Sequence, residues 1–247
     1  MGLKAQKKFL PKHEKFVFYD LAYIAFADAP AGTEQGWWSV SGDFGVMFES
    51  SWSEKGGIAY GISYSFQNFS NNHLVSTDLN SGAGLYQLAS DTSFERSYQS
   101  FQYLYIPVEL RFRSKKNEKN KFYRFYLGAR GGVRTTGSSS IRRANSRVRF
   151  YQLDDVRRFR ADAYLKIGYG NTSLYAFYAL TPLYNAGDIL SQDGSNANSL
   201  QNIRPMGIGL SFMLWKTQDR CAARNERRDR IRDSRSLRWE RRETRDD

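Results

Sequence analysis

Apolar and polar residues alternate along the central part of the chain, between residues 100 and 170. Leu104 and Ile106 belong to the apolar set there, whereas Glu109 and Arg111 belong to the other. Successive side chains of a β-strand point to opposite faces, so this period of two predicts strands with one apolar and one charged face.

The same alternation continues toward both ends and predicts eight strands, at residues 15–27, 38–50, 57–70, 98–113, 122–134, 159–170, 173–184 and 202–215. These lengths are near the roughly 9–11 residues that a tilted membrane strand needs. An even number of strands can close the sheet and leave no unpaired edge. We therefore expect an all-β fold, an eight-stranded antiparallel up-and-down transmembrane β-barrel with a charged C-terminal extension.

The small residues indicate which face of the predicted barrel points inward. Gly128, Gly132 and Gly168 share the charged face with long side chains, which is the mixture of sizes that a narrow interior requires. The apolar face ends in aromatic residues such as Tyr123 and Tyr169, where an interfacial girdle would lie. The apolar face is therefore predicted to face lipid.

The predicted connections alternate between short and long. Residues 51–56, 114–121 and 171–172 form short turns, whereas 71–97, 135–158 and 185–201 are long. Outer-membrane barrels place short turns in the periplasm and long loops outside. Both chain ends are then expected on the periplasmic side.

Composition and charge agree with this picture. Aromatic residues make up 15% of the chain while the mean hydropathy is −0.63, a combination that excludes long apolar helices. The net charge of +12 is concentrated at the ends, with +4 in residues 1–15 and +4 in 216–247. A basic stripe with base-stacking residues, typical of a nucleic-acid binder, is missing from the central strands, so no nucleic-acid partner is expected.

These features predict three segments. Residues 1–14 form a basic N-terminal segment, 15–215 the barrel, and 216–247 an Arg-rich tail that is disordered or helical, because it has too few apolar residues to bury a core. The N-terminal segment has a basic start but no apolar stretch typical of a secretory signal.

Three runs carry a resemblance to a known family: 103–134 (YLYIPVELRFRSKKNEKNKFYRFYLGARGGVR), 167–184 (IGYGNTSLYAFYALTPLY) and 203–212 (IRPMGIGLSF). They resemble the PorT-like outer-membrane β-barrels of Bacteroidetes-type bacteria. The resemblance implies an eight-stranded barrel in the cell outer membrane, in contact with the lipid bilayer. One branch of the family takes part in type IX secretion, which makes periplasmic or secretion-machinery proteins possible partners. No catalytic motif is carried over.

The inward face holds charges of both signs in nearly equal number, namely Asp20, Asp43, Glu49, Glu109, Arg111, Arg124, Arg130, Arg160, Asp162 and Lys166. A barrel of this size encloses only enough space for its own side chains. We therefore expect an ion-paired network that plugs the lumen, with a route for ions or protons as the alternative.

A second candidate site is a basic loop that contains Arg142, Arg143, Arg147, Arg149, Arg157 and Arg158. Arginine binds phosphate through two donors at once. The simplest interpretation is a solvated loop, and the alternative hypothesis is that the loop binds lipopolysaccharide phosphates or an acidic partner.

Catalytic chemistry has little support in the sequence. Only His13 and His73 could serve as a histidine base, and His73 lies in a long loop near Ser70, Ser76 and Asp78. This grouping is the only version of a loop-borne hydrolase or acyltransferase that the chain offers. Two histidines and the single, distant Cys221 cannot build a typical zinc site, so we expect no enzyme, metal or cofactor.

The expected function is that of a non-enzymatic outer-membrane barrel with a structural, binding or secretion-accessory role. The alternative from another class is a soluble lipocalin-like barrel that carries a hydrophobic ligand. It would reverse the faces, with Leu104 and Ile106 inside and Arg130 and Lys166 outside.

Overall fold

The computed structural model describes residues 12–29, 33–76, 84–87, 96–115, 117, 121–143, 146–151, 156–185 and 202–217. Residues 1–11 of the predicted N-terminal segment and 218–247 of the predicted tail lie outside the described residues. Within the described part, no helix is long and apolar enough to cross a membrane.

Eight strands form the wall of a closed barrel, which confirms the predicted fold class. They are β1 (Lys12–Ala27), β2 (Val40–Ser51), β3 (Gly56–Asn71), β6 (Arg96–Arg113), β7 (Tyr123–Arg143), β9 (Phe159–Tyr169), β10 (Thr172–Ala179) and β11 (Arg204–Thr217). Three further strands, β4 (His73–Ser76), β5 (Gly84–Gln87) and β8 (Ser146–Tyr151), lie in the connections between wall strands.

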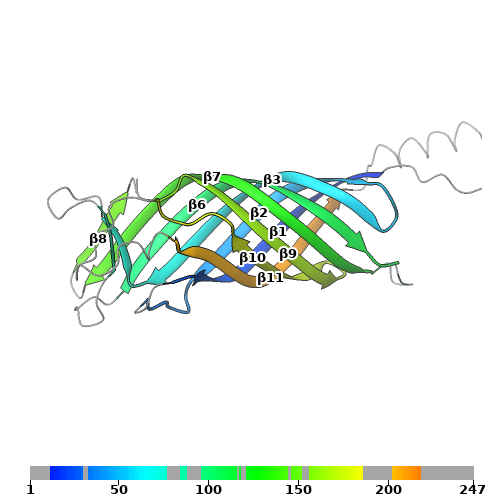
Figure 1. Cartoon of the computed structure of the whole chain (residues 1–247). Coiled ribbons are helices and arrows are strands. Elements are labelled where there is room, and N and C mark those ends of the chain that lie inside the picture. The colour runs from blue at the N-terminus through cyan, green and yellow to red at the C-terminus, as the bar shows by residue number, and fades with distance from the viewer. Residues whose placement is uncertain are drawn as a thin grey trace, which may run out of the picture.

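Each wall strand is antiparallel to its two neighbours, and β1 closes the barrel by pairing with β11. Tyr19 of β1 lies opposite Phe212 in this closing pair and opposite Phe44 on the other side. Closure gives the backbone donors and acceptors of every wall strand a neighbouring strand to pair with. Figure 1 shows the strands running obliquely to the long axis of the barrel, as closure requires.

The two ends of the barrel differ in their connections. One end, the short-turn end, has the connections 52–55, 114–122 and 170–171; the other, the long-loop end, has 28–39, 72–95, 144–158 and 180–203. Gly170 has a φ of +65°, a backbone conformation that glycine adopts without steric cost. This glycine permits the tight turn that joins β9 to β10.

Strand β7 is longer than the predicted span, which ended at residue 134. It continues to Arg143 because partners on both sides pair with its last residues. Arg142 lies opposite Arg96 of β6 and opposite Arg147 of β8. The hairpin of β7 and β8 therefore extends the wall at the long-loop end, at the left of Figure 1.

Strand β10 is shorter than the predicted span, which ended at residue 184. It ends at Ala179, and the next residues leave the ladder, with the amides of Leu180 and Thr181 both directed at the carbonyl of Ala161. Pro182 has no N–H to donate. Residues 180–185 turn into the barrel mouth instead.

Candidate functional site: the lumen and the basic extension

An aromatic layer fills the lumen at the long-loop end. Its members include Ile24, Phe26, Phe69, Phe101, Val156, Leu183, Tyr184 and Ile203. Tyr184 donates a hydrogen bond to Gln99 Oε1 at 2.8 Å, and its carbonyl accepts one from Arg157 Nε at 3.0 Å. Residues 180–185 thus cover the lumen, a feature that the strand predicted over 173–184 missed and that Pro182 could have signalled.

A central cluster of Asp43, Arg130, Arg160 and Asp162 lies below the aromatic layer. Arg130 binds Asp43 at 2.8 Å and Asp162 at 2.9 Å. Arg160 binds Asp162 at 2.7 Å and donates to Gln67 Oε1 at 2.6 Å. Because β3 and β6 separate Asp43 on β2 from Arg130 on β7, this ion pair reaches across the lumen.

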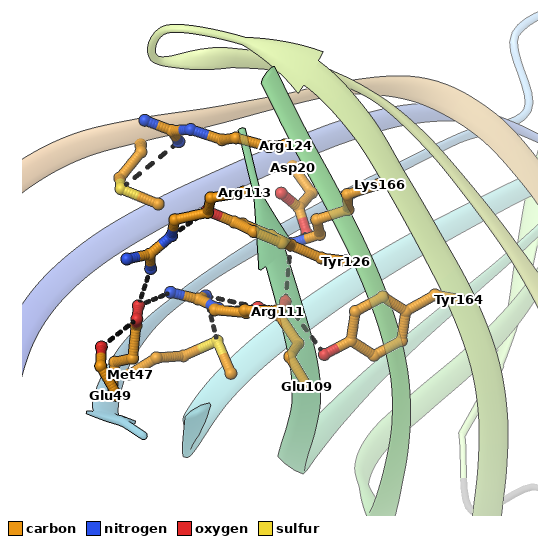
Figure 2. Close-up of polar contacts among 12 residues, drawn as sticks. Asp20, Met47, Glu49, Glu109, Arg111, Arg113, Arg124, Tyr126, Tyr164 and Lys166 are labelled. Atoms are coloured by element: carbon orange, nitrogen blue, oxygen red, sulfur yellow. Dashed lines mark hydrogen bonds and ion pairs between the residues drawn. The ribbon is translucent and has the colours of Figure 1, made fainter. Parts of the chain in front are cut away.

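A second group, the lower cluster, joins Asp20, Glu49, Glu109, Arg111, Arg113 and Lys166 toward the short-turn end. Arg111 binds Glu49 at 2.9 Å and also contacts Glu109. Lys166 binds Asp20 at 2.8 Å and Glu109 at 3.4 Å. Figure 2 shows these contacts as one continuous chain, with Arg113 and Arg111 converging on Glu49.

The structure places all ten predicted lumen charges inside the barrel. Arg113 joins them although it was not among the predicted residues; it lies two positions after Arg111 on the same face. Breaking a buried ion pair leaves an uncompensated charge and is costly. The two clusters together hold opposite walls of the barrel to each other.

Arg124 differs from the predicted network. It lies in the lumen and is 6% exposed, but no carboxylate binds it among the described residues. Its guanidinium donates to Met213 Sδ at 3.6 Å and to Asn171 Oδ1 at 3.4 Å. Figure 2 shows it apart from the contacts that reach Glu49.

The predicted basic loop is largely a β-extension of the wall. Arg142 and Arg143 end β7, and Arg147 and Arg149 lie on β8. Arg149 is exposed and donates to the Tyr151 hydroxyl at 3.2 Å.

Two of the predicted loop arginines lie away from this extension. Arg157 holds the Tyr184 carbonyl, and the carbonyl of Arg158 accepts a hydrogen bond from the Arg134 amide at 2.8 Å. Arg157 therefore supports the barrel mouth with its side chain, whereas Arg158 does so with its backbone carbonyl and keeps an exposed side chain.

The strand register places two arginines of the extension beside one of β6. Arg142 lies between Arg96 on one neighbour and Arg147 on the other. Like charges directly opposite each other in a sheet are unfavourable unless something compensates them. We refer to these three residues as the arginine row.

His73, the only candidate for a loop-borne base, is the first residue of β4 and pairs with Gln87 of β5. Ser70 lies at the end of β3, where its amide donates to Ser39 Oγ at 3.0 Å. Asp78 lies outside the described residues.

The outer surface of the wall is a belt of exposed apolar side chains. It includes Leu21, Phe44, Val46, Ile58, Ile62, Leu104, Ile106, Val108, Leu110, Phe125, Leu127, Ile167, Leu174, Ile208 and Leu210. Small residues, namely Ala25, Ala163 and Ala176, leave a groove of about 560 Å³ in this belt. Arg130 and Lys166 are buried while Ile106 is exposed, the reverse of the arrangement that a lipocalin-like barrel needs.

Comparison with protein families decides what this barrel is. The model of a family described as outer membrane protein beta-barrel domain matches residues 19–185. The chain belongs to this family. No match is found among curated proteins.

Membership in this family explains why the outer surface of the barrel is apolar. The chain is an integral outer-membrane β-barrel protein, and the belt lies against the bilayer. Barrels of this kind keep their short turns in the periplasm and their longer loops outside. This rule puts the arginine row on the outer side and Arg124 on the periplasmic side.

Proposed function

We propose that this barrel is a non-enzymatic, PorT-like component of the cell envelope that binds phosphate groups at the outer surface through its β7–β8 extension. The lumen is plugged, and the extension is the part that meets other molecules. Its resemblance to PorT-like barrels also supports a secretion-accessory role with periplasmic or secretion-machinery proteins.

The arginine row is the observation that carries the proposal. Three arginines occupy facing positions on neighbouring strands, and a phosphate bound at this edge would offset the positive charge that the register gathers there. Arginine and phosphate form charge-assisted, two-donor contacts, which are about twice as strong as neutral hydrogen bonds. Lipopolysaccharide phosphates occur at the height where an extension beyond the wall would meet them.

The plugged lumen supports a role without transport. Arg130 reaches Asp43 and Lys166 reaches Asp20 from opposite sides of the barrel. Tyr175 also crosses to Asp43, with its hydroxyl 3.4 Å from the carboxylate. Side chains engaged in this way leave the loops and the extension to carry the function.

The test is binding of lipopolysaccharide to the refolded full-length protein, with native and dephosphorylated lipopolysaccharide as probes. A variant in which serine replaces Arg142, Arg143, Arg147 and Arg149 should bind native, phosphorylated lipopolysaccharide at least about tenfold more weakly, which corresponds to roughly 1.4 kcal/mol. The dephosphorylated form should bind weakly to both proteins.

The control removes charge from the other end of the barrel. Lys55, Lys115 and Lys121 are exposed near the short turns, and their replacement by serine should leave binding unchanged. Equal binding by the arginine variant and the parent would overturn the proposal. Turnover of lipid or peptide substrates that is lost in His73→Ala would overturn its non-enzymatic part.

A further inference from the structure

Two groups of lumen charges are balanced by their own ion pairs. In the central cluster Arg130 and Arg160 face Asp43 and Asp162. In the lower cluster Arg111, Arg113 and Lys166 face Asp20, Glu49 and Glu109. Each cluster therefore has as many cations as carboxylates.

Arg124 is a lumen cation outside this balance. Its Nε is buried and has no hydrogen-bond partner among the described residues, and its two terminal nitrogens meet a thioether sulfur and an amide oxygen. Arginine stays protonated in proteins, so the charge has to be compensated from outside the side chain.

A neighbouring arginine increases the need for a negative charge beside Arg124. Arg113 lies directly opposite it on β6, and like charges in facing positions are destabilising. Arg113 is neutralised by Glu49, which leaves Arg124 as the excess charge. A buried ion without a partner is strongly destabilising.

A small cavity adjoins Arg124 at the short-turn end. Its lining combines Arg124, Arg111 and Lys166 with the polar side chains of Asn171, Ser173 and Ser211. Ser211 contacts Asp20, whereas the hydroxyl of Ser173 has no such partner among the contacts of the described residues. Three cations therefore border a single space.

The cavity limits the size of its ligand. The centre of a water-sized species has about 10 Å³ in which to move, which is room for one small species. Phe16, Phe18 and Met213 form its apolar sides. Phosphate esters and nucleotides are too large, whereas a monatomic anion matches both the space and the missing charge.

We propose that Arg124 binds a small monovalent anion of the size of chloride at the short-turn end of the lumen. The anion neutralises Arg124 and separates it from Arg113. It stabilises the folded barrel and has no counterpart site in the unfolded chain. This site is distinct from the arginine row and does not rest on the proposed function.

The experiment compares sodium chloride with sodium gluconate at equal ionic strength, using the full chain refolded in detergent micelles. A ligand that binds only the folded state raises stability with the logarithm of its concentration above Kd. The unfolding midpoint in urea should therefore rise with chloride in the parent protein. Arg124→Gln should abolish that rise, while Lys115→Gln, which removes an exposed charge at the same end, should retain it.

Two results would overturn the proposal: equal midpoints of the parent in both salts, or a chloride response that persists in Arg124→Gln. If Arg124→Gln does not fold, bromide-soaked crystals of the parent decide the matter. An anomalous peak beside Arg124 and Ser173 supports the site, and its absence overturns it.

Discussion

The lumen and the outer belt are built from the same strands, yet they follow opposite rules. On β6, Glu109 and Arg111 are buried, whereas Val108 and Leu110, which alternate with them along the strand, are exposed. In a soluble barrel the first pair would meet water and the second would form the core. The difference shows that alternation makes the two faces, and the solvent decides which one is the interior.

The two faces also hold together by different means. The lumen depends on specific partners, since Arg130 needs two carboxylates on two strands. The belt depends on bulk lipid, which accepts any apolar side chain of suitable size. A substitution in the lumen should therefore lower the free energy of unfolding according to the number of ion-pair partners lost. A substitution in the belt should lower it according to the charge that it places in the membrane.

The largest effect is expected when the ion pair that crosses the lumen is broken. Arg130→Ala leaves Asp43 without its arginine and removes one of two cations from Asp162. Removing one partner of a buried pair typically costs about 3–5 kcal/mol. Urea unfolding in liposomes should show a loss of this order.

Arg149→Ala provides the comparison, because the side chain of Arg149 is exposed. Its effect should stay within about 0.5 kcal/mol, as for ordinary surface changes. A loss for Arg130→Ala no larger than that of Arg149→Ala would contradict a structural role for the central cluster.

Charge placed on the belt should have the next largest effect. Ile106 is 65% exposed on the middle of β6, and a lysine there would meet hydrocarbon. Ile106→Lys should cost about 2–4 kcal/mol, the penalty for a cation near the bilayer midplane. Unfolding from liposomes measures it directly.

Trp37 tests whether the loss of stability in Ile106→Lys comes from contact with lipid or from the exposed position alone. It is 72% exposed but lies in the connection between β1 and β2. Trp37→Lys should change stability little, although the two positions are similarly accessible. Similar effects at both sites would mean that Ile106 does not face the bilayer.

The strands and their faces could be predicted because alternation is local. The period of two is visible within each strand, and the glycines and rim aromatics then favoured the inward charged face. The end of β7 could not be predicted in this way. Residues 135–143 (TTGSSSIRR) have no apolar face, and they form a strand because β6 and β8 pair with them.

The partners within the lumen also depend on closure. Arg113 and Arg124 are the same residue type on the same face and lie opposite each other. Closure of the barrel brings Glu49 to Arg113, whereas Arg124 contacts no carboxylate in the part of the chain that the structure describes. The sequence placed both arginines on one face, but it could not distinguish their roles.

A methyl group added to the lumen should have a moderate effect. A Cβ at Gly128 would lie 2.3 Å from Cζ of Tyr164, beneath the ring that reaches Glu109. Overpacking of this kind costs about 1–3 kcal/mol, so Gly128→Ala should lower the free energy of unfolding by that amount.

Gly131, three residues along the same strand, is the matched control. A Cβ there would meet nothing within 4 Å. Gly131→Ala should be neutral, because alanine suits a strand at least as well as glycine. Equal losses at both glycines would point to a backbone requirement and not to crowding in the lumen.

The smallest effect is expected from one hydroxyl group. Tyr164 donates to Glu109 Oε1 at 3.1 Å, and Glu109 keeps Arg111 and Lys166 as partners when the hydroxyl is removed. Tyr164→Phe should therefore cost about 0.5–1.5 kcal/mol, the net value of a single hydrogen bond. The measurement is urea unfolding in the same liposomes.

Tyr60 is the control on the belt, where it is exposed and stacks on Phe48. Tyr60→Phe should change stability by less than Tyr164→Phe, because the ring stays in the membrane and no lumen partner is lost. If the two variants lost equal stability, the Tyr164 hydroxyl would add nothing specific to the lower cluster. The lumen would then be held by its ion pairs alone.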